Sequence, residues 1–93
     1  KKIILLYEGR ETIMTMLAVF RSRAQTLDFT AALRAAGVVV SAVNTPKEAG
    51  VGCGVSARFA DRDFARVQAV FRRRTYSSFA GFMKRVGERY VFC

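Results

Sequence analysis

Residues 16–43, MLAVFRSRAQTLDFTAALRAAGVVVSAV, predict a strand, a helix and a second strand in succession. The run opens with five apolar residues, as is typical of a short buried strand. We expect a helix from Ser22 to Ala36, because serine is a favourable N-cap and Gly37 can adopt the left-handed conformation that ends a helix. Residues 38–43 are rich in valine and predict the second strand. Pro46 stops that strand because proline has no N–H for the ladder.

The second half of the chain places another helix between two further strands. Residues 55–59 alternate in polarity and predict a third strand. We expect Asp61 to cap a helix whose C-terminus is closed by the arginines at 72–74. The apolar stripe of that helix has helical spacing and consists of Phe64, Val67, Val70 and Phe71. A fourth strand is predicted within residues 76–83, and residues 90–92 fit either a short strand or a packed tail.

The order strand–helix–strand–strand–helix–strand predicts an α+β protein. It is typical of a two-layer ferredoxin-like βαββαβ sandwich, in which two helices cover one face of an antiparallel sheet. We expect residues 14–93 to form a single domain of this class. Residues 1–13 are either an extra N-terminal strand or a segment that is not native to the protein, and both interpretations stay open. An apolar edge strand favours association, so a second copy of the chain is one expected partner.

Composition narrows the class of protein further. The chain has 93 residues, of which 52% are hydrophobic, and this suffices for one packed core. Its apolar runs are far shorter than the ~20 residues of a membrane-spanning helix, so we expect a cytoplasmic protein without a membrane partner. The sequence contains no histidine, which excludes a cysteine–histidine nucleophile pair and any histidine-containing metal site within it. We expect neither a metal nor a cofactor.

A formal net charge of +9 indicates an anionic partner. Nucleic acid and an acidic protein both fit this charge, and so does a solvated arginine-rich surface that binds neither. The cations of the second predicted helix lie largely opposite its apolar stripe. We assign anion or partner docking to Arg62, Arg66 and Arg73. A nucleic-acid-binding module, the alternative, would also use Arg72 and Arg74 as phosphate contacts.

Cys53 is the residue with the most informative surroundings. It lies in Gly50-Val51-Gly52-Cys53-Gly54, where alternating glycines leave the thiol unshielded and allow backbone N–H groups to approach it. The loop at 45–52 is longer than most hairpin loops, and unusual length often accompanies function. Lys47 and the positive field favour a reactive thiolate. The alternative is a small structural cysteine in the core, and the residues alone leave both interpretations open.

The block PKEAGVGCGVSARF, residues 46–59, resembles the signature of a small bacterial family described as Se/S carrier protein-like. The segment LRAAGV at 33–38 also matches, and the resemblance extends over about residues 16–82. It implies that Cys53 carries sulfur or selenium as a persulfide or selenosulfide. The loop-shaping residues would then be Pro46, Lys47, Glu48, Gly50, Gly52 and Gly54.

The resemblance implies a carrier or co-substrate in a relay rather than a self-sufficient enzyme. Its partners would be a donor and an acceptor protein, which the sequence does not identify. Two other interpretations stay open, a basic nucleic-acid-binding module and an interaction domain with a structural cysteine. Glu48 as a proton acceptor and Cys93 as a resolving thiol are weaker hypotheses, because loop glutamates are usually solvated and terminal residues are usually mobile.

Overall fold

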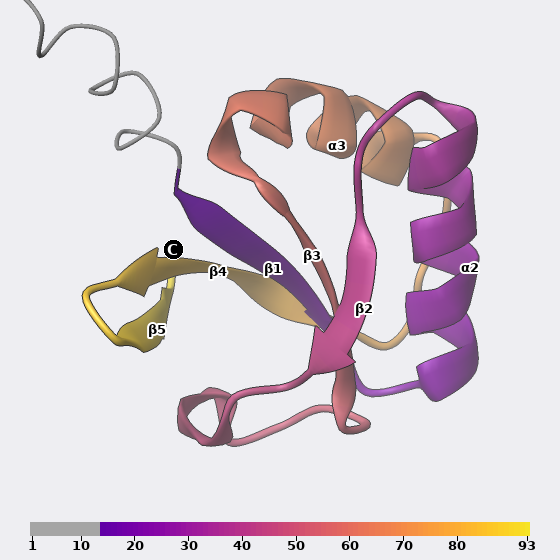
Figure 1. The fold of residues 1–93 in the computed structure, drawn as a ribbon. Coiled ribbons are helices and arrows are strands. Elements are labelled where there is room, and N and C mark those ends of the chain that lie inside the picture. The colour runs from indigo at the N-terminus through magenta and orange to yellow at the C-terminus, as the bar shows by residue number, and fades with distance from the viewer. Residues whose placement is uncertain (1–13) are drawn as a thin grey trace, which may run out of the picture.

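A computed structural model describes residues 14–93 of the chain. Figure 1 shows two helices, α2 and α3, beside a sheet. In chain order the elements are β1 (Thr15–Phe20), α2 (Arg23–Ala35), β2 (Ser41–Asn44), the 3₁₀ turn η1 (Lys47–Ala49), β3 (Val55–Ala60), the 3₁₀ turn η2 (Asp61–Asp63), α3 (Phe64–Arg72), β4 (Phe79–Val86) and β5 (Arg89–Phe92). None of the helices in this described part is long and apolar enough to cross a membrane. Residues 1–13, including the extra strand considered there, lie outside the described residues.

The strands form one five-stranded sheet in the order β2-β3-β1-β4-β5. Every neighbouring pair is antiparallel. The predicted α+β class, with an antiparallel sheet and two helices, is therefore confirmed. The sheet departs from the expected four-stranded ferredoxin-like sandwich by β5, which extends the edge beyond β4. Residues 90–92, for which a strand and a packed tail were both open, belong to this fifth strand.

The main core fills the space between the helices and one face of the sheet. Met16, Ala18 and Phe20 alternate along β1 and all point to this face, as the two-residue period of a strand requires. They pack with buried residues of both helices and of β3, and the predicted stripe of α3 lies in the same cluster. Each fully buried phenylalanine or leucine there stabilises the fold by roughly 1.5–3 kcal/mol.

A smaller core lies on the opposite face of the sheet. Leu17 and Val19 of β1 point there and are fully buried together with Met83 of β4. Ala49, at the end of η1, packs onto them. The long loop between β2 and β3 therefore folds back across the sheet and contributes a side chain to the core.

The second strand begins later than predicted, at Ser41 instead of Val38. Gly37 ends α2 with a φ of +86°, and the Val38 N–H donates to Leu33 O at 2.9 Å. This bond closes a Schellman motif, so the N–H of Val38 serves the helix end instead of a sheet ladder. Val39 is 82% exposed as a result, while Val38 is buried in the main core.

Asp61 does not cap the second helix as expected. It begins η2, and α3 starts only at Phe64, without a side-chain cap. The Oδ1 of Asp61 instead accepts a hydrogen bond from the Met14 N–H at 3.1 Å, and the Asp61 N–H donates to Met14 O at 2.8 Å. Asp61 thus ties the end of β3 to the start of β1. The fourth strand is also displaced from its predicted range, since β4 runs from Phe79 to Val86.

Candidate functional site

Cys53 lies directly before β3, at the end of the loop that crosses the sheet. Its N–H donates to Phe20 O, the last residue of β1, at 3.1 Å. Phe20 is followed at once by the start of α2, so the thiol lies where the end of β1, the N-terminus of α2 and the β2–β3 loop meet. In Figure 1 this is the lower end of the molecule, away from α3.

The sulfur of Cys53 contacts two oxygen atoms. Its S–H donates to Val55 O at 3.4 Å, and Thr26 Oγ1 lies 3.5 Å from Sγ. Thr26 is fully buried in the second turn of α2, and its hydroxyl donates to Ser22 O at 3.0 Å. Cys53 itself is half-buried and belongs to neither core cluster. The sulfur therefore packs against α2, while the residue as a whole keeps part of its surface exposed.

The loop reaches Cys53 through glycines with positive φ. Gly52 has φ +120° and Gly54 has φ +96°, so the thiol is flanked by two residues in a conformation that other residues rarely adopt. At Gly52 the backbone also passes close to β1, since a Cβ there would lie 3.4 Å from Val19 Cγ1. The loop encloses an open depression of about 280 Å³, whose lining includes both glycines that flank Cys53 but not Cys53 itself. The lining residues are Thr45, Pro46, Lys47, Gly50, Val51, Gly52 and Gly54.

Glu48 holds the other end of the loop against β5. Its Oε2 accepts a hydrogen bond from the Tyr90 N–H at 2.8 Å. This bond is the main reason that the pKa of Glu48 is lowered, with smaller contributions from its own backbone N–H, Arg89 and Lys47. The carboxylate thus has its hydrogen-bond partner on β5, so the structure gives no support to Glu48 as a proton acceptor for Cys53.

Hydroxyl and amide side chains fix the N-terminus of α2 next to the thiol. Ser22 caps the helix as predicted, its Oγ accepting from the Gln25 N–H at 3.1 Å. Gln25 Oε1 accepts from both the N–H and the hydroxyl of Ser78, at 3.0 and 2.7 Å. The N-terminus of α2, against which Cys53 packs, is thereby attached to the segment that leads into β4.

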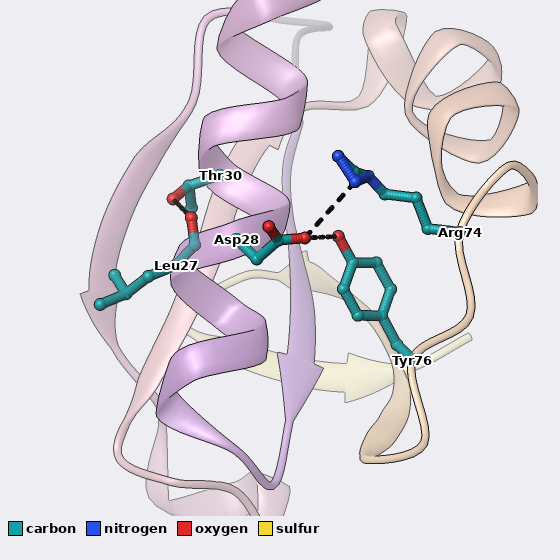
Figure 2. A network of polar contacts seen from close by, with 5 residues as sticks. All are labelled: Leu27, Asp28, Thr30, Arg74 and Tyr76. Carbon is teal, nitrogen blue, oxygen red and sulfur yellow. Dashed lines mark hydrogen bonds and ion pairs between the residues drawn. The ribbon is translucent and has the colours of Figure 1, made fainter.

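One turn further along α2, Asp28 joins the helix to the same segment (Figure 2). Its Oδ2 accepts from the Tyr76 hydroxyl at 2.6 Å and pairs with Arg74 Nη1 at 3.6 Å. The pKa of Tyr76 is raised, chiefly because burial disfavours the phenolate anion. Asp28 raises it further, because its carboxylate accepts a hydrogen bond from the hydroxyl and its negative charge would repel the phenolate. The negative charge of Asp28 is therefore already engaged within the fold.

Two of the three predicted docking arginines, Arg62 and Arg66, lie away from the thiol, and the third, Arg73, is the C-cap residue of α3. Arg62, Arg66 and Arg73 are exposed, but Arg62 follows the end of β3 that is remote from Cys53. Arg66 lies beside Gly37, past the C-terminus of α2. The exposed cations at the thiol-bearing end include Lys47, on which the sequence-based prediction relied, and also Arg21 and Arg23, which it did not include. The topology gives the missing signal, because the hairpin after β2 and the end of β1 lie at the same end of the sheet.

Cys93 is exposed, and its N–H donates to Phe82 O on β4 at 3.0 Å. Both thiols are free. Within residues 14–93 there is no group of three or more His, Cys, Asp or Glu side chains that would hold a metal ion.

A comparison with protein families identifies the domain. Residues 15–77 match the family described as "Putative Se/S carrier protein-like". The chain belongs to this family. The match spans β1 to the segment before β4 and includes Cys53, its glycine loop and Thr26, whereas β4, β5 and Cys93 lie outside it. Comparisons with curated proteins and with solved structures gave no match.

Proposed function

We propose that this Se/S carrier protein-like chain transports sulfur or selenium on Cys53. The cysteine accepts the atom from a donor protein as a persulfide or selenosulfide and passes it to an acceptor protein. The carrier class comes from the family, which covers Cys53. The observation that carries the assignment to this residue is its half-buried position between Gly52 and Gly54, two glycines that line an open depression.

The transfer is balanced without an external oxidant or reductant. The Cys53 thiol loses its proton, and the thiolate attacks the outer sulfur of a persulfide on a cysteine of the donor protein. The S–S bond of the donor breaks, its electron pair leaves with the donor cysteine, and that thiolate takes up a proton. Cys53 then carries one extra sulfur, and delivery to the acceptor repeats the same exchange in the opposite sense.

The loop around Cys53 suits such an adduct. A persulfide lengthens the side chain by one S–S bond of about 2 Å, and Cys53 is half-buried between two exposed glycines that carry no side chain to block the added atom. In this proposal Gly50, Gly52 and Gly54 give the loop its path, and Pro46 begins the η1 turn that Lys47 and Glu48 continue. Glu48 acts as a structural anchor through Tyr90.

Intact mass spectrometry tests the proposal. Protein incubated with a persulfide donor and freed of excess reagent should gain one sulfur, about 32 Da, and lose it on treatment with dithiothreitol. Cys93→Ser is the matched control and should retain the adduct, while Cys53→Ser should not form it. If the adduct persists in Cys53→Ser and disappears in Cys93→Ser, Cys53 is not the carrier.

A further inference from the structure

We propose that Arg21 and Arg23 form a docking rim for an acidic segment of the donor or acceptor protein. This inference rests on the proposed carrier function of Cys53 and names the partner chemistry at that site. It moves the partner surface from α3, where charge alone indicated it, to the junction of β1 and α2.

Backbone contacts place this rim next to the thiol. The carbonyl that accepts the Cys53 N–H belongs to Phe20, the residue before Arg21. Arg23 is the first residue of α2 and lies three positions before Thr26, whose hydroxyl meets the Cys53 sulfur at 3.5 Å. Both arginines are exposed. The segment that bears them therefore borders Cys53.

Within residues 14–93, no carboxylate forms an ion pair with the arginines of the rim. In the part of the chain that the structure describes, the ion pair is that between Arg74 and Asp28. Asp28 is engaged by Tyr76 and Arg74, and Glu48 by the Tyr90 N–H. Arg21 and Arg23 thus present free cations beside the thiol, and such charges attract and orient an anionic partner.

Exposed apolar side chains favour a protein segment over a small anion. Leu27, one turn beyond Arg23 on α2, is 41% exposed, and Val51, two residues before Cys53, is 39% exposed. A small inorganic anion would leave both uncovered. An acidic peptide segment with apolar side chains would bury them while its carboxylates face the arginines.

The rim is tested with synthetic peptides in the Cys93→Ser background, where Cys53 is the reacting thiol. Two peptides carry one cysteine activated as a thiopyridyl disulfide, flanked in one by aspartate and glutamate and in the other by asparagine and glutamine. Stopped-flow absorbance of the released thiopyridone gives the rate of exchange with Cys53. At low ionic strength the acidic peptide should react on the order of tenfold faster, and the advantage should shrink towards 0.15 M salt, where the Debye length is about 8 Å.

Two charge-reversal variants decide where the attraction originates. Arg21→Glu with Arg23→Glu should abolish or invert the preference, while Arg62→Glu with Arg66→Glu, which changes net charge equally at the remote end, should retain most of it. Arg21→Gln with Arg23→Gln should give an intermediate ratio, and circular dichroism verifies that each variant is folded. Equal loss in the two reversal variants, or no preference in the parent protein, overturns the rim. If Cys53 exchanges with neither peptide, the carrier function fails as well, so the two failures are distinguishable.

Discussion

The two ends of the molecule differ in the side chains that link their elements. At the end that bears Cys53, buried hydroxyls link separate elements, as in the Thr45–Ser56 contact of 2.7 Å and the Thr26–Cys53 contact of 3.5 Å. At the opposite end, main-chain bonds close α2 in a Schellman motif and Asp61 ties β3 to β1. Exposed arginines occur at both ends. Charge therefore does not distinguish the two, whereas the polar contacts around a half-buried thiol do.

Gly52 and Gly37 provide the largest expected contrast. Gly52→Ala should destabilise the fold by about 1–3 kcal/mol, because a non-glycine residue is strained at its φ of +120° and the new Cβ meets Val19. Gly37→Ala should cost about 1 kcal/mol, the usual price of a non-glycine residue in a left-handed helix end. Urea denaturation measures both.

The same pair sharpens the assignment of the site. Gly52→Ala should also change the alkylation rate of Cys53, because it redirects the loop, whereas Gly37→Ala should leave that rate unaltered. Equal effects of the two variants on Cys53 would mean that the remote end also controls the thiol.

Thr26 and Thr30 are the next contrast, since both are buried on α2. The Thr30 hydroxyl donates to Leu27 O at 2.8 Å within its own helix (Figure 2), whereas the Thr26 hydroxyl contacts the Cys53 sulfur. Replacing either with valine should cost about 1 kcal/mol through the lost hydrogen bond. Only Thr26→Val should slow the alkylation of Cys53, by a factor of about five. The Thr26 hydroxyl donates to Ser22 O beside the neutral thiol, and we expect it to turn and donate to the sulfur when Cys53 ionises.

Thr26→Ser restores the hydroxyl and should recover the alkylation rate. If Thr26→Val reacts as fast as the parent protein, the hydroxyl has no part in holding the thiolate, and the contact in the structure is packing alone.

The smallest expected effect concerns the Glu48 anchor and its pH dependence. The pKa of Glu48 in the folded state is lowered from its ordinary value of 4.5, mainly by the Tyr90 N–H. Its contribution to stability is therefore fully present above pH 4.5 and is lost as pH falls through the lowered pKa. The difference in urea midpoint between the parent protein and Glu48→Gln should shrink from pH 6 to pH 3. A difference that grows on acidification would contradict this sign.

Local signals in the sequence predicted much of the first half of the fold. Ser22 and Gly37 were sufficient to bracket α2, because a cap and a left-handed glycine act within one turn of the helix. The late start of β2 was missed because the Val38 N–H could donate either to a neighbouring strand or to a carbonyl at the end of α2. The sequence alone does not distinguish these two hydrogen bonds. β5 remained undecided because its pairing with β4 depends on a hairpin instead of on a strong apolar alternation.

For the candidate site, the assignment to the Cys53 thiol stays a prediction, and the sequence missed the residues that surround it. Cys53 was recognisable because glycines and the family signature lie beside it in the chain. Arg21 and Thr26 are remote from it in sequence and approach it only when the end of β1 and the β2–β3 loop meet. The arginines in and around α3 formed the most conspicuous cluster of charge in the sequence. Their distance from Cys53 could not be predicted, because it depends on the order of the strands in the sheet.

The N–H of Cys53, and not its sulfur, attaches this residue to β1. A main-chain hydrogen bond of this kind does not depend on which side chain the residue carries. Selenocysteine or a fluorophore-labelled cysteine at the same position would keep the path of the chain while changing the length and nucleophilicity of the arm. The position is therefore a natural attachment point for a reporter of partner binding.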